Sequence, residues 1–76
     1  MGRSVGTVRE WRDEEGWGVI DSPETPGGCW AIFAVVEMEG YKSLTPGQRV
    51  EFVWRYPGQD GYDYAAEEVR PLRDNV

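Results

Sequence analysis

The feature that most constrains this chain is the regular interruption of short apolar runs by glycine and proline. Ten glycines and five prolines fall in clusters between runs rich in Val, Ile, Trp, Tyr and Phe, in a chain of 76 residues. Glycine and proline favour turns, whereas β-branched and aromatic residues favour strands. A chain of this length forms one domain at most, so we expect a single all-β domain over residues 1–76.

The apolar runs predict the order and connections of the strands. We expect strands at about 5–12, 16–22, 29–34, 48–56 and 62–72. The turn-rich segments 22–28 and 57–61 form hairpin loops, and the longer connection 34–47 holds one helical turn within 35–38. Three meandering strands, a long crossover and a final hairpin fit a five-stranded antiparallel Greek-key barrel, in which closure hides most strand edges.

Alternation along the fourth strand indicates which side chains fill the barrel. Val50, Phe52 and Trp54 share one face of that strand. The interior is expected to consist of Val8, Ile20, Leu44, Val50, Phe52, Trp54, Val69 and Leu72. A small barrel has room for little more than such a core, so burying all four tryptophans would overfill it. Some large aromatic rings are therefore expected on the surface.

The aromatic residues outside this core form a candidate binding surface. A period of two puts Trp17 and Val19 on one face of the second strand, and Trp30 and Ile32 on one face of the third. Trp17 stands between two glycines, so we expect its ring to stay open to a flat partner. The expected surface consists of Trp11, Trp17, Trp30, Phe33 and Tyr41. Aromatic residues on short strands are most often core, but this set as a whole favours stacking of single-stranded nucleic acid with little sequence preference.

The charge balance limits how such a ligand is held. Eight Lys and Arg oppose 14 Asp and Glu, which gives a net charge of −6 and argues against a broad basic face that grips duplex DNA. Arg9, Arg12, Lys42 and Arg55 are the cations expected near the aromatic surface. We therefore predict few phosphate contacts.

Enzymatic and metal-dependent functions lack their usual residues. The chain has no histidine and a single cysteine, so it offers neither the ligands of a common zinc site nor a Ser or Cys nucleophile with its commonest base. No Gly-rich phosphate loop is present. We expect no enzyme, cofactor or metal, and we interpret the acidic stretch 12–15 as a solvated turn and Cys29 as a small buried side chain.

The same residues bear on the compartment. One cysteine forms no internal disulfide, the first residues lack an apolar signal segment, and no run approaches the length of a membrane span. A soluble cytoplasmic protein is expected, with no membrane association and no obligate protein partner.

The order of several short segments also resembles a known family. These segments are Gly6–Arg9, Gly16–Ile20, Trp30–Phe33, Gly40–Leu44 and Gly47–Phe52. Together they resemble the bacterial cold-shock domain over about residues 5–72, with Glu15–Ile20 similar to its first RNA-binding motif and Cys29–Phe33 similar to its second. The resemblance implies an OB-type barrel that binds single-stranded RNA or DNA through stacked bases, as an RNA chaperone or a regulator of transcription or translation.

The resemblance also implies a set of site residues and several departures. Those implied or expected at the site are Trp11, Trp17, Trp30, Phe33, Tyr41, Arg9, Arg12, Lys42, Val19 and Ile32. Four residues differ from the family pattern: Glu10 replaces a stacking tryptophan, Glu15 a lysine, Val19 a phenylalanine and Ile32 a histidine. Asp60 lies in a hairpin turn that is often basic in the family. These differences predict fewer stacking rings and a weak electrostatic contribution.

Two other ligand classes remain open from the sequence. An acidic rim beside an aromatic groove also suits a basic or proline-rich peptide, so a peptide- or protein-binding barrel is the main alternative. An oligosaccharide is a third possibility, because sugars also stack on tryptophan. Tyr62 and Tyr64 either extend the surface or cover the end of the barrel.

Overall fold

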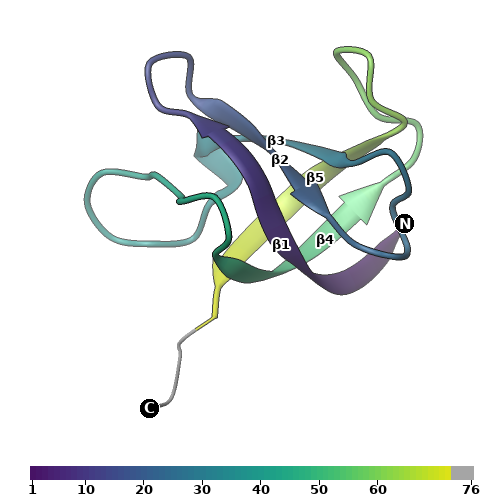
Figure 1. Ribbon diagram of the computed structural model, residues 1–76, viewed down its shortest axis with the longest axis horizontal. Helices are drawn as coiled ribbons and strands as arrows, with labels where there is room; N and C mark the ends of the chain where they lie inside the picture. The colour runs from purple at the N-terminus through teal and green to yellow at the C-terminus, as the bar shows by residue number, and fades with distance from the viewer. Residues whose placement is uncertain (73–76) are drawn as a thin grey trace.

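The computed structural model describes residues 1–72, which form a closed barrel of five strands (Figure 1). The strands are β1 (Gly2–Arg12), β2 (Trp17–Asp21), β3 (Cys29–Ile32), β4 (Arg49–Arg55) and β5 (Tyr64–Pro71). Their order around the barrel is β1-β2-β3-β5-β4. The predicted all-β, five-stranded barrel is confirmed. No helix within the described residues is long and apolar enough to cross a membrane.

One pairing in the barrel departs from the fully antiparallel expectation. β4 pairs antiparallel with β1, and β5 pairs antiparallel with β4. Because β5 therefore runs in the same direction as β3, these two strands pair in parallel where the barrel closes. The long crossover makes this closure possible, since it delivers β4 to the far side of β1 before the chain returns as β5.

The long strand β1 belongs to both halves of the barrel. Residues 2–7 pair with β4, and residues 7–12 pair with β2. A β-bulge between Val8 and Glu10 interrupts the pairing with β2, and such a bulge bends a strand and increases its twist. β1 starts three residues earlier than predicted, because Gly2 already pairs with Trp54.

The crossover is attached to the barrel near its start. β3 ends at Ile32, and the 3₁₀ helix η1 (Phe33–Val35) follows, two residues before the predicted helical turn. Val36 instead forms an isolated bridge with Val69 and is fully buried. The core takes the side chain of Val36, and so the helical turn ends before it.

The core matches the expected set in six of its eight members. Val8, Ile20, Leu44, Val50, Phe52 and Val69 are buried, together with Cys29, Ala31, Val36 and Ala66. Trp54 lies at the edge of this core, and its indole Nε1 donates a hydrogen bond to Ser4 Oγ at 3.0 Å. Leu72 follows the last strand and is exposed, so its predicted place in the core is wrong.

The buried Cys29 leads to a prediction about thiol reactivity. Burial raises the pKa of the Cys29 thiol from 9.0 to about 12, against a smaller opposing effect of the Arg55 charge. At pH 8 this lowers the thiolate fraction by roughly a thousandfold, and only the thiolate reacts. We expect Cys29 to resist a thiol reagent until denaturant is added. Labelling of the folded protein at the rate of a free cysteine would contradict this burial.

The same shift in pKa gives a direction for the stability of the protein. The raised pKa means that the folded state holds its thiol proton where the unfolded state releases it. The free energy of unfolding therefore keeps its full value below about pH 9, as far as this thiol is concerned, and falls as the pH rises from 9 toward 12.

Candidate nucleic-acid interface

The outer face of β1, β2 and β3 gathers half of the predicted site. Residues directly opposed in an antiparallel register share a face. By this register the outer face carries Glu10, Arg12, Trp17, Val19, Trp30 and Ile32. The predicted sharing of one face by Trp17 and Val19, and by Trp30 and Ile32, is confirmed.

Trp11 lies on the other side of β1. It is paired with Gly18 and packs against the core from its edge. The β-bulge between Val8 and Glu10 explains this placement, because one extra residue reverses the alternation of all the residues that follow it. The structure therefore separates Trp11 from the other predicted stacking residues.

Gly18 has a different role from the one expected. A Cβ at this position would overlap the ring of Trp11, so glycine makes room for Trp11 on the inner side of the sheet. Gly18 does not leave the ring of Trp17 open, because the two residues face opposite sides of β2.

Trp17 and Trp30 lie against each other on the outer face. Their ring centroids are 6.4 Å apart and their planes differ by 25°. Trp30 is only 8% exposed, whereas Trp17 is half-buried. A cavity of about 260 Å³ is lined by these two rings together with Asp60 and Tyr62 from the β4–β5 loop. Trp30 therefore offers a ligand only a small part of its ring.

The two tyrosines near β5 have different surroundings. Tyr62 lines the cavity beside Trp30. Tyr64 packs against the core, with its ring edge-on to Trp54 at a centroid distance of 5.3 Å. Of the two roles left open by the sequence, Tyr62 borders the candidate surface and Tyr64 covers the end of the barrel.

The two aliphatic site residues also differ. Val19 is opposite Glu10 and Trp30 in the sheet, and it has no exposed surface. A ligand on this face therefore cannot touch Val19 in the structure as it stands. Ile32 is partly exposed beside Trp17.

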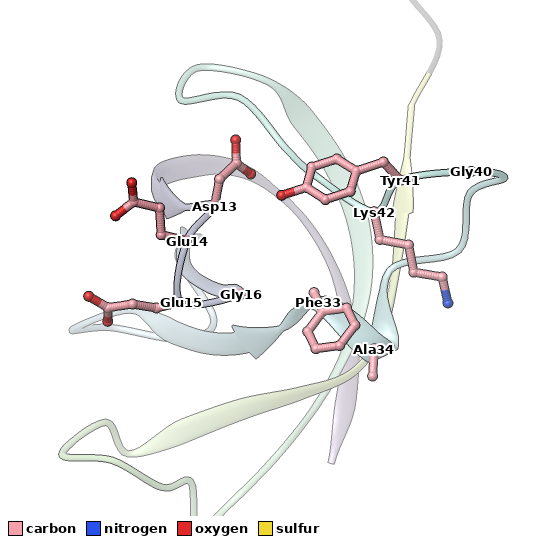
Figure 2. A pocket seen from close by; sticks show the side chains of 9 residues that line it. All are labelled: Asp13, Glu14, Glu15, Gly16, Phe33, Ala34, Gly40, Tyr41 and Lys42. Atoms are coloured by element: carbon pink, nitrogen blue, oxygen red, sulfur yellow. The ribbon is translucent and has the colours of Figure 1, made fainter.

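A larger cavity opens between the β1–β2 turn and the crossover (Figure 2). It measures about 550 Å³, and its lining residues are Asp13, Glu14, Glu15, Gly16, Phe33, Ala34, Gly40, Tyr41 and Lys42. Phe33 is 48% exposed and Tyr41 is 73% exposed. Gly16 has a φ of +79°, and a Cβ there would stand 2.9 Å from the Phe33 ring, so glycine allows this ring to lie against the turn. These two rings are the most accessible of the predicted set.

Carboxylates engage both arginines of the predicted site, Arg9 and Arg12. Arg9 Nη2 lies 2.6 Å from Asp21 Oδ1, and this hydrogen bond raises the pKa of Arg9. Arg12 Nη2 lies 3.1 Å from Glu10 Oε1, and its guanidinium sits 5.5 Å from the centroid of the Trp17 ring. Each charge is therefore largely balanced within the protein before a polyanion approaches.

The other two cations have no ion pair within residues 1–72. Lys42 lines the larger cavity. Arg55 donates a hydrogen bond to Gln59 Oε1 at 2.6 Å. Lys42 is therefore the predicted cation best placed to meet a phosphate at the exposed rings.

Two polar contacts at the site were absent from the sequence prediction. Trp17 Nε1 donates to Glu15 Oε1 at 2.8 Å, and Ser43 Oγ donates to Asp13 Oδ1 at 2.6 Å. The second contact joins the β1–β2 turn to the crossover across 30 positions of the chain. No local pattern predicts a contact of that separation. The first contact is local, because Glu15 lies two residues before Trp17, and their spacing was the available signal.

Comparison with known proteins gives close relatives over nearly the full chain. The sequence is 38% identical over 70 residues to "Cold shock protein CapB" of Pseudomonas syringae pv. tomato, which covers 92% of this chain and 96% of the relative. It is 35% identical over 70 residues to "Cold shock-like protein CspD" of Haemophilus influenzae, covering 92% and 93%. It is 39% identical over 68 residues to "Major cold shock protein CspA" of Pseudomonas aeruginosa, covering 90% and 93%. No protein-family model matches the chain.

Proposed function

Since the chain belongs to the bacterial cold-shock protein family, we propose that it binds single-stranded RNA or DNA by stacking bases on its surface aromatics. The observation that carries the proposal is the pair of exposed rings, Phe33 and Tyr41, beside an open cavity of about 550 Å³. Trp17 extends this stacking surface. It directly follows Gly16, and the Phe33 ring lies against Gly16. Proteins in which aromatic rings lie along a groove hold single strands in this way.

The three accessible rings set the scale of the affinity. Each base stacked on an aromatic side chain contributes about 1–3 kcal/mol, so Trp17, Phe33 and Tyr41 together supply roughly 3–9 kcal/mol before ordering costs. A dissociation constant in the micromolar range or weaker corresponds to this total. Binding of this kind suits a chaperone or a regulator of transcription or translation, which must release its strand. The reduced, buried Cys29 fits a cytoplasmic site of action.

The direct test is a titration followed by tryptophan fluorescence. A short oligothymidine and a mixed-sequence RNA are added separately at low salt, and we expect each to change the emission through Trp17. If a saturating oligonucleotide leaves the emission unchanged, nucleic acid is not the ligand.

The peptide-binding alternative has one observation in its favour. The acidic turn formed by residues 13–15 borders the aromatic cavity, and this combination would also suit a lysine-rich peptide. Saturation by such a peptide without any response to oligonucleotides would replace the proposal with the alternative.

The paired arginines predict a weak dependence of binding on salt. With Arg9 and Arg12 already balanced by carboxylates, we expect about one to three phosphate contacts. The slope of log Kobs against log salt should then lie between about −0.7 and −2. Titrations at several salt concentrations measure this slope, and a value steeper than about −4 would contradict the electrostatic picture.

A matched pair of variants locates the phosphate contact. Lys42→Gln should flatten the slope by about 0.7, because it removes the cation beside the exposed rings. Arg3→Gln carries the same charge change on the half of β1 that pairs with β4, and it should leave the slope unchanged.

A further inference from the structure

We propose that the larger cavity selects guanine, and that Asp13 is the residue that reads the base. The inference rests on the proposed function and concerns the same surface. It follows from the walls of the cavity, from the position of one carboxylate and from the hydrogen-bonding edges of the four bases.

The walls of the cavity present aromatic rings on one side and carboxylates on the other. Phe33 and Tyr41 lie on the crossover side of the opening, and the acidic turn lies on the other side (Figure 2). A base stacked on either ring would direct one of its edges toward the turn. The groups on the turn then determine which edge is accepted.

Asp13 is the carboxylate of the turn that is aimed into the opening. Figure 2 shows Asp13 and the hydroxyl of Tyr41 pointing toward one another, while the carboxylates of Glu14 and Glu15 point away from Tyr41. Glu15 already accepts a hydrogen bond from Trp17 Nε1. Of the three acidic residues, Asp13 alone combines an inward direction with free acceptor capacity.

A second contact holds Asp13 in this orientation. Its Oδ1 accepts a hydrogen bond from Ser43 Oγ at 2.6 Å, which ties the turn to the crossover. A carboxylate has about four acceptor positions, so several remain for a ligand after this contact. The carboxylate is thus oriented before a base arrives, which reduces the entropy lost on binding.

The chemistry of the base edges favours guanine. The Watson–Crick edge of guanine presents two adjacent donors, N1–H and the N2 amino group, which match the two oxygens of a carboxylate. Uracil and thymine present one donor between two carbonyl oxygens, and these oxygens repel a carboxylate. Adenine and cytosine each offer one amino donor beside an acceptor. Recognition on this edge is the usual way in which proteins read unpaired bases.

Guanine and inosine provide the decisive comparison. Inosine keeps the purine ring and N1–H of guanine and lacks only the N2 amino group. Two heptamers of uridine carrying one guanosine or one inosine at the central position are titrated into the wild-type protein. We expect the guanosine heptamer to bind about 5- to 20-fold more tightly, and the all-uridine heptamer to bind no better than the inosine one. Equal affinity for guanosine and inosine would overturn the proposal.

Variants assign the effect to Asp13. Asp13→Asn keeps an acceptor for Ser43 but loses one carboxylate oxygen, and the ratio of guanosine to inosine affinity should fall to near one. Glu14→Gln makes the same charge change on the same turn, yet it should preserve the ratio. Ser43→Ala leaves the carboxylate in place without its tether, and it should lower the ratio only in part.

The outcomes separate this proposal from the proposed function. A ratio that persists in Asp13→Asn would assign the selectivity to another group and overturn the role of Asp13. Failure of all three heptamers to bind the wild-type protein would remove the proposed function itself. The wild-type ratio tests guanine selectivity even if Asp13→Asn is unstable, and Ser43→Ala then tests the role of Asp13 by a change that leaves the carboxylate intact.

Discussion

Gly6→Ala is expected to unfold the barrel, with a loss of about 3–5 kcal/mol from the free energy of unfolding. A Cβ at Gly6 would overlap the backbone carbonyl oxygen of Asp21 and would stand 3.0 Å from both Ile20 and Phe52. A backbone oxygen cannot move away without breaking the pairing of β1 with β2. A domain of this size has only about 3–5 kcal/mol of stability in total, so little folded protein should remain. Far-ultraviolet circular dichroism and urea titration measure the loss.

Gly47→Ala is the matched control for this substitution. Gly47 has a φ of +91°, but a Cβ there would meet no atom within 4 Å. Alanine in this left-handed conformation costs about 1–2 kcal/mol through the backbone alone. If Gly6→Ala unfolds at the same urea concentration as Gly47→Ala, the close approach of β1 to β2 is not a determinant of stability.

The double variant Phe33→Ala with Tyr41→Ala is expected to lose at least about thirtyfold in affinity for a single strand. Each ring supplies one stack worth at least about 1 kcal/mol, and Phe33 and Tyr41 are 48% and 73% exposed. Because neither ring is buried in the core, the urea midpoint should remain close to that of the wild type. Fluorescence titration through the retained Trp17 measures the affinity.

Tyr56→Ala tests whether any exposed aromatic ring would give the same result. Tyr56 is 65% exposed and lies just beyond β4, with its ring 5.6 Å from that of Tyr64. This substitution should leave the affinity unchanged. Equal losses in Tyr56→Ala and in the double variant would mean that binding does not depend on the cavity between the turn and the crossover.

Local pattern was sufficient to predict the barrel and most of its outer face. The alternation of Trp17 with Val19, and of Trp30 with Ile32, identifies one face of each strand because the side-chain period of a strand is two. The spacing of the Gly and Pro clusters locates every strand to within three residues. These features depend on neighbours in the chain, which a sequence contains directly.

The incorrect placements come from contacts between distant parts of the chain. The bulge between Val8 and Glu10 turns Trp11 inward, and no residue type in that stretch predicts a bulge. Trp30 is only 8% exposed. It lines a cavity together with Asp60 and Tyr62, which lie about 30 residues further along the chain.

Charge pairing was equally hidden from the sequence. Arg9 counts as a cation in the composition, yet Asp21 on the neighbouring strand neutralises it across a gap of 12 residues. Composition predicts a weak electrostatic contribution, and the ion pairs of Arg9 and Arg12 support that prediction.

The parallel pairing of β3 with β5 gives the barrel a seam. Within residues 1–72 it is the shortest strand pairing, with Cys29 opposite Tyr64 and Trp30 opposite Ala65. Local opening begins where the fewest hydrogen bonds must break. We therefore expect the barrel to open first between β3 and β5, with the fastest amide hydrogen exchange at that pairing. Trp17 and Trp30 on one side of this seam, and Asp60 and Tyr62 on the other, line the smaller cavity, so a ligand in that cavity would contact both sides. Such a ligand would oppose local opening, so the fraction of barrels that are closed would rise with the fraction that hold ligand.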